Sequence, residues 1–166
     1  ESYILLQYTP KNFHPPTSIS FMEFANFAAV IIPLATNTIN KVMIAMDSGD
    51  SELFSSCFTE TGTCTIQIAN NTTHTGTAEL QKLCKTLSEK FSGVRHWEGN
   101  VCLQEGEEGG LTNTSYWKAM NGGEVVSTGI HKDILECDGE TCKIIERIII
   151  HTWTKEGGHI DITTTP

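Results

Sequence analysis

The second half of the chain is a series of short apolar, β-branched runs separated by glycine-rich turns, and no other feature restricts the possible folds as strongly. Asn-Gly-Gly at residues 121–123 stands between two such runs, which is a strong signal for a β-hairpin. Because successive hairpins pair neighbouring strands, this half predicts a mostly antiparallel sheet. The predicted strands cover residues 101–104, 115–120, 124–130, 134–137, 142–153 and 159–163.

Two segments indicate how this sheet is covered. The isoleucines of residues 144–150 are apolar on both faces of a strand, so we expect that strand to be central and covered on both sides. A helix is predicted over residues 77–91, with Gly93 following its end. Its apolar stripe has helical spacing and consists of Leu80, Leu83, Cys84, Leu87 and Phe91. This helix should cover one face of the sheet.

The first half of the chain is harder to interpret. A helix over residues 18–32 that stops before Pro33 fits the spacing of its apolar residues, although residues 27–32 also fit a buried strand. The other predicted strands are 3–8, 39–47, 53–58 and 63–69. The whole pattern predicts an α+β fold that is predominantly antiparallel β, a sheet or sandwich covered by one or two helices. We expect a single domain over 1–166, in which 162–166 begin a Thr/Pro-rich stalk or form a frayed terminus.

The chain contains six cysteines, an even number that suits a disulfide framework in an oxidising compartment. The shortest loops favour three local bonds, so the fold is expected to be disulfide-stapled. The predicted pairs are Cys57 with Cys64, Cys84 with Cys102, and Cys137 with Cys142. A zinc site is the competing interpretation, but the paired Cys-x-x-Cys spacing of zinc sites is missing.

Three Asn-x-Ser/Thr triplets are acceptor sites for N-linked glycan if the chain is exported, and they begin at Asn70, Asn71 and Asn113. Together with the cysteines they predict a secreted protein or one on the extracellular side of a membrane. The first residue is Glu1, as in a trimmed ectodomain. The longest apolar run, residues 21–34, is too short to cross a bilayer, so we expect membrane attachment only through an anchor outside this chain.

The formal net charge of −9 argues against nucleic acid as a partner, because such surfaces need clustered Lys and Arg. Hydrophobic residues make up 39% of the chain and charged residues 19%, which is typical of a globular protein. The charge and composition therefore leave proteins and small molecules as the possible partners.

Several histidines and carboxylates are candidates for chemistry, and each also has a structural explanation. His96 and Glu98 are two residues apart and could form a general acid/base pair, although neighbours on one face of a strand share that spacing by geometry alone. His131 beside Asp133, and His151, are further candidate bases, although a lone histidine on a strand is more often structural. The carboxylates Asp47, Asp50 and Glu52 could hold calcium, but a solvated acidic turn explains them better. We therefore predict no catalytic residue, no metal and no cofactor.

These observations predict a non-enzymatic glycoprotein domain that binds an extracellular protein, as a receptor ectodomain or decoy does. The partner-binding surface stays unknown, since Tyr116 and the tryptophans could be interface anchors or core. A carrier of a small apolar ligand in an internal cavity is the first alternative, although the Gly-x-Trp of lipocalins is missing. A secreted hydrolase using His96, Glu98 or His131 is the second.

Overall fold

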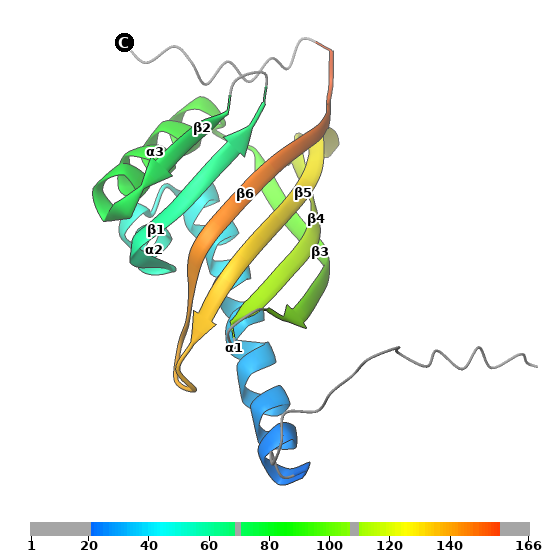
Figure 1. Cartoon of the computed structure of the whole chain (residues 1–166). Coiled ribbons are helices and arrows are strands. Elements are labelled where there is room, and N and C mark those ends of the chain that lie inside the picture. The colour runs from blue at the N-terminus through cyan, green and yellow to red at the C-terminus, as the bar shows by residue number, and fades with distance from the viewer. Residues whose placement is uncertain (1–20, 69–70, 107–109, 157–166) are drawn as a thin grey trace, which may run out of the picture.

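The computed structural model describes residues 21–68, 71–106 and 110–156, which form a twisted six-stranded sheet with helices packed on one face (Figure 1). The predicted strands 3–8 and 159–163 and the stalk at 162–166 lie outside the described residues. The helices are α1 (Phe21–Ser48), α2 (Ser51–Ser56) and α3 (Gly76–Lys90). The strands are β1 (Phe58–Gln67), β2 (Thr72–Thr75), β3 (Arg95–Glu105), β4 (Leu111–Asn121), β5 (Glu124–Cys137) and β6 (Cys142–Thr154).

The strand order is β2-β1-β6-β5-β4-β3, and every neighbouring pair is antiparallel except β1 with β6. The predicted α+β, mostly antiparallel architecture is therefore confirmed. The predicted hairpin joins β4 to β5, where Gly122 and Gly123 have φ angles of 56° and 88°. Glycine suits both positions because it has no Cβ to oppose positive φ.

The outer face of the sheet is not covered by any described element, so the sandwich alternative is wrong (Figure 1). Strand β6 is interior to the sheet, as its isoleucines predicted, with Ile144 and Ile149 buried on the helix side. The opposite side chain of Ile145 is 40% exposed. The predicted cover on both sides of this strand is therefore wrong.

Helix α1 is one continuous helix, whereas we expected a helix ending before Pro33 and a strand over 39–47. Its buried positions have helical spacing and are Ile31, Ala35, Thr38, Ile39, Val42, Met43, Ala45 and Met46. Pro33 lies inside the helix with its side chain exposed. Packing of this apolar face on the sheet outweighs the cost of an interior proline, about 3 kcal/mol.

Among the described residues, one stretch, Ala29–Ser48 of α1, is long and apolar enough to cross a membrane by length and composition alone. Nearly half of that stretch is buried inside the protein. Figure 1 shows α1 running along the helix side of the sheet, with its amino-terminal part extending past the strands. Its carboxyl-terminal half is therefore a core element of the sheet-and-helix fold.

Of the two helices after α1, α2 was predicted as a strand and α3 was predicted as a helix. Residues 53–58, predicted as a strand, belong mainly to the short helix α2, in which the Asp50 side chain accepts the Leu53 N–H at 2.9 Å as an N-cap. The predicted helix over 77–91 is α3, and its ends differ by one residue. The buried side chains of α3 pack against β1.

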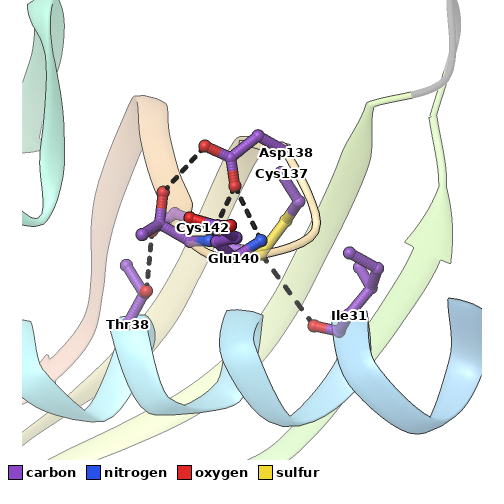
Figure 2. The surroundings of a disulfide bond; sticks show 7 residues. Ile31, Thr38, Cys137, Asp138, Glu140 and Cys142 are labelled. Atoms are coloured by element: carbon purple, nitrogen blue, oxygen red, sulfur yellow. Dashed lines mark hydrogen bonds between the residues drawn. A yellow bond between two sulfur atoms is a disulfide. The ribbon is translucent and has the colours of Figure 1, made fainter.

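One disulfide bond is present, between Cys137 and Cys142 at the end of the β5–β6 hairpin. Figure 2 shows this hairpin end lying on α1, where the Thr38 hydroxyl donates to the Cys142 carbonyl at 2.8 Å. The Ile31 carbonyl of the same helix lies 3.9 Å from the Cys142 sulfur. The hairpin is therefore fixed both to itself and to the helix.

The other four cysteines are free, so the predicted pairs Cys57–Cys64 and Cys84–Cys102 do not form. Cys84 is buried on α3 with its sulfur 3.6 Å from the Ala45 carbonyl of α1, whereas Cys102 is exposed on β3 at an edge of the sheet. Burial raises the pKa of the Cys64 thiol to about 12 and that of Cys84 to about 11. Such thiols stay protonated and unreactive near neutral pH.

Candidate functional site

A cavity of about 270 Å³ lies between α1, α3 and the inner face of strands β1 and β3 to β6. Its wall is mostly apolar, with a few polar side chains that converge on it, which is the usual composition of a small-molecule site. The apolar lining residues are Met43, Met46, Ile66, Leu87, Phe91, Val94, Trp117, Ala119, Val126 and Ile149. The polar ones are Asp47, Ser88, His96, Asn121, Ser127, His131, His151 and Thr154.

Asp47 and His96 form a hydrogen-bonded pair in this wall. The His96 Nδ1 lies 2.6 Å from Asp47 Oδ1, and the backbone N–H of His96 donates to Asp47 Oδ2 at 2.8 Å. Both side chains are 13% exposed. Because an ionised carboxylate only accepts hydrogen bonds, it fixes the proton of neutral His96 on Nδ1 and leaves Nε2 as a base.

His131 lies fully buried in the same wall, and its Nδ1 lies 2.9 Å from Glu98 Oε1. Glu98 also accepts a hydrogen bond from the Ser115 hydroxyl. Burial alone would raise the pKa of Glu98, but the hydrogen bond from His131 and the charge of Arg147 lower it to about 2. Burial and the charge of Arg147 lower the pKa of His131. The pair is therefore a carboxylate beside a neutral imidazole.

His151 is the third histidine of the cavity, and its Nδ1 lies 3.3 Å from the Ser127 hydroxyl. Burial, followed by the charges of His131 and His96, lowers the pKa of His151 to about 4. This imidazole is therefore neutral at physiological pH.

Trp117 of β4 is surrounded by these histidines. Its ring is stacked on His131 with centroids 5.6 Å apart and meets His151 edge-on at 4.7 Å. The ring fits because its neighbour on β5 is Gly129, where a Cβ atom would lie 2.5 Å from Trp117 Cε2. The absence of a side chain at Gly129 therefore leaves the space that the Trp117 ring occupies in the cavity wall.

Behind this wall lies a buried ion pair. The Arg147 guanidinium donates from Nε to Asp133 Oδ1 at 2.7 Å and from Nη2 to Asp133 Oδ2 at 3.0 Å. The Asn113 amide donates to the same carboxylate at 2.8 Å and to Ser115 at 3.0 Å. Asn113 is 2% exposed, so the folded chain cannot carry a glycan there and this predicted glycosylation site is wrong.

The remaining predicted positions that the structure describes lie on the surface. Asn71 is exposed before β2, and Asn70 lies outside the described residues. Trp97 and Trp153 are each 49% exposed and Tyr116 is 57% exposed, so only Trp117 belongs to the core.

The three carboxylates considered for calcium are used separately. Asp47 binds His96, Asp50 caps α2 and Glu52 is exposed. Within the described ranges, no cluster of three His, Cys, Asp or Glu side chains could hold a metal ion.

The sequence indicates His96, Glu98, His131 and His151 as candidates, but their spacing does not show that they lie together. Strand register brings them together, since His96, His131 and His151 of β3, β5 and β6 line one cavity, while Glu98 lies behind His131. The partnership of Asp47 with His96 was missed because residues 39–47 were assigned to a strand. The helical spacing of Ile39, Val42, Met43 and Met46 was the signal that could have placed Asp47 at the end of a helix.

Comparison with known proteins identifies the family of the chain. A family model for a SnoaL-like domain matches residues 35–159, about three quarters of the chain. No curated protein sequence matches the chain.

Several solved structures share the fold. LinA has a TM-score of 0.69 and 15% identity, over 86% of this chain and 98% of LinA. ActVI-ORFA from Streptomyces coelicolor has a TM-score of 0.61 and 19% identity, over 74% of this chain and 97% of that chain. A protein of unknown function with a cystatin-like fold from Nostoc punctiforme has a TM-score of 0.62 and 20% identity, over 81% of this chain and 95% of that chain.

Proposed function

The chain belongs to the SnoaL-like domain family, and we propose that it binds a small, largely apolar molecule on which Asp47 and His96 act as an acid–base pair. The observation that carries this proposal is the hydrogen bond between these two residues in the wall of an apolar cavity. They come from α1 and β3, 49 residues apart in the chain, so the fold itself assembles the pair.

Membership of this family corrects the function predicted from the sequence. The SnoaL-like family includes polyketide cyclases, which are enzymes acting on small molecules. The prediction of a non-enzymatic glycoprotein domain that binds an extracellular protein is therefore wrong. The first alternative, a small apolar ligand in an internal cavity, agrees better with the family and with the cavity.

The chemistry follows from the orientation of the pair. With Nδ1–H held by Asp47, the Nε2 lone pair of His96 can remove a proton from a bound molecule. The imidazolium that forms is stabilised by the Asp47 carboxylate, and it can return the proton at another atom of the substrate. The surrounding apolar side chains exclude water and strengthen both electrostatic interactions.

A carrier without chemistry would need the same apolar cavity. It would have no use for a carboxylate held at 2.6 Å from a histidine inside that cavity, because burying this pair costs desolvation energy. The Asp47–His96 pair therefore favours an enzyme over a carrier.

The proposal can be tested with 5-nitrobenzisoxazole, a small apolar bicyclic compound that reports on bases in apolar sites. Removal of its carbon-bound proton drives cleavage of the N–O bond and yields a coloured cyanonitrophenolate, so no other reactant is needed. We expect His96→Ala to lower kcat/KM by at least about tenfold, because a positioned general base typically contributes 10² to 10⁴. Asp47→Asn should lower it as well, since the amide does not stabilise the imidazolium.

His74→Ala is the matched control, because His74 lies on β2 and does not line the cavity. Its rate should equal that of the wild type. A wild-type rate no higher than that of His96→Ala would contradict the assignment of His96 as the base.

A further inference from the structure

His131 and His151 are not used by the proposed acid–base pair, yet both line the cavity. The tautomer of His131 is set by Glu98, whose carboxylate can only accept a hydrogen bond because its pKa is lowered to about 2. The proton of neutral His131 must therefore be on Nδ1, which lies 2.9 Å from Glu98 Oε1. Its Nε2 is left with a lone pair, which makes it a hydrogen-bond acceptor.

Ser127 sets the tautomer of His151 in the same way. The Ser127 hydroxyl has a single proton, which it donates to the Trp153 carbonyl at 2.9 Å. Toward His151 Nδ1, 3.3 Å away, Ser127 can therefore only accept, so Nδ1 holds the proton of this imidazole. Its Nε2 is a second acceptor in the same cavity.

The described part of the protein provides no donor for either Nε2 atom and no cation in the cavity wall. Both Nδ1 atoms are engaged as stated, and no hydrogen bond from the described residues reaches the Nε2 atoms. The lining includes no Lys or Arg among those residues. The nearby Arg147 guanidinium does not line the cavity and is hydrogen-bonded to Asp133 and to the Met43 sulfur. A ligand must therefore bring the donors itself.

Building on the proposed function, we propose that His131 and His151 are specificity-determining residues that accept hydrogen bonds from the hydroxyl groups of an uncharged ring compound. The cavity of about 270 Å³ equals the volume of roughly nine waters at about 30 Å³ each, which suits a molecule of about two fused rings. The Trp117 ring supplies an aromatic surface against which such rings can stack.

The negative charges around the cavity disfavour anionic ligands. Asp47 lines the cavity and the ionised Glu98 lies directly behind His131. A carboxylate ligand would meet two like charges and two lone pairs without a facing cation. The site should therefore discriminate against anions of the same ring size.

The inference is tested with three probes that share one ring system: 2-naphthol, 2-methoxynaphthalene and 2-naphthoate. Calorimetric titration of the wild-type chain should give the lowest Kd for 2-naphthol, at least about threefold below that of 2-methoxynaphthalene, as one hydrogen bond between neutral groups contributes. The anion 2-naphthoate should bind most weakly. These three measurements need no variant, so they test the inference even if a substitution prevents folding.

The variants His131→Asn and His151→Asn keep an amide N–H for Glu98 and for Ser127 and leave no acceptor at the Nε2 position, because the amide oxygen takes the place of the ring Cδ2 atom and reaches less far. In the double variant the preference for 2-naphthol over 2-methoxynaphthalene should fall to about one, whereas His74→Asn should keep the wild-type preference.

Equal binding of the two neutral probes by the wild type would overturn this inference and leave the proposed function intact. Preferred binding of 2-naphthoate would also overturn it. No binding of any probe would overturn the proposed apolar cavity function together with it.

Discussion

Arg147 is the residue whose burial constrains the fold most, because it is a fully buried cation with one carboxylate partner. Although burial alone would lower the pKa of its guanidinium, the charges of Asp133 and Glu98 raise it above its usual value. The ion pair holds β5 and β6 in register directly behind the cavity histidines. Breaking it leaves a buried charge without its counter-ion, which costs more than the intact pair contributes.

We therefore expect Arg147→Met to lower the free energy of unfolding by about 3–5 kcal/mol, because it leaves the Asp133 carboxylate unpaired. The double variant with Asp133→Asn removes both charges and should recover most of that loss. Urea denaturation of the three proteins measures the difference. A single variant within about 1 kcal/mol of the wild type would contradict the assigned role of the pair.

Asn113 shows why a residue motif can mislead. The triplet at 113–115 has the form of a glycan acceptor, but β4 pairs on both sides and turns Asn113 into the core. The motif contains no information about burial, which depends on strands far along the chain. The same is true of His131 and His151, whose proximity is a consequence of strand register and not of local spacing.

At the scale of the elements, the β4–β5 turn and helix α3 could be predicted from the sequence, because the signals for Gly122 and for α3 are local. The strand predicted over 39–47 was wrong because Val42, Ile44 and Met46 fit a period of two as well as they fit part of a helical face. Ile44 is 62% exposed while Val42 and Met46 are buried, which only a helix explains. The apolar spacing that continues from Ala35 through Ile39 to Val42 is what distinguishes the helix from a strand.

The β5–β6 hairpin is the element whose stability depends on a covalent bond. Its disulfide closes a short loop, so the chain-entropy relation predicts a loss of about 2 kcal/mol when Cys137→Ala and Cys142→Ala are combined. The hairpin end should then detach more readily from Thr38 of α1. Urea denaturation with and without dithiothreitol measures the effect.

Cys102→Ala is the control for the hairpin, because this thiol is free and exposed and its loss should change stability by less than about 0.5 kcal/mol. If dithiothreitol left the wild-type midpoint unchanged, the hairpin bond would have no part in stabilising the fold.

For the whole molecule, one disulfide and a sheet with a helix-covered core replace the disulfide-stapled domain that we predicted. The core is large enough to be stable without three crosslinks. Export of the chain stays a prediction, since a fold of this kind is compatible with either compartment.

The buried histidines of the cavity wall make the whole fold sensitive to acid. The pKa of His151 is lowered to about 4, and burial also lowers that of His131, whereas an unfolded histidine titrates near 6.5. Between these values the unfolded chain binds more protons than the native one, so stability is complete above about pH 6.5 and is lost as the pH falls toward 4. Glu98, with its pKa lowered to about 2, adds a further loss below its ordinary value of 4.5.

We therefore expect the urea midpoint to be constant from pH 8 to 7 and to fall steadily from pH 6.5 to 4. Burial and the charges of His131 and His96 all oppose the protonation of His151. His151→Asn removes one titrating group and should make the midpoint fall less steeply over this range, while His74→Asn, outside the cavity, should reduce the slope less because its pKa is less strongly displaced. A midpoint that did not change between pH 7 and 4.5 would mean that these imidazoles are solvated, and the cavity would then be open to water rather than apolar.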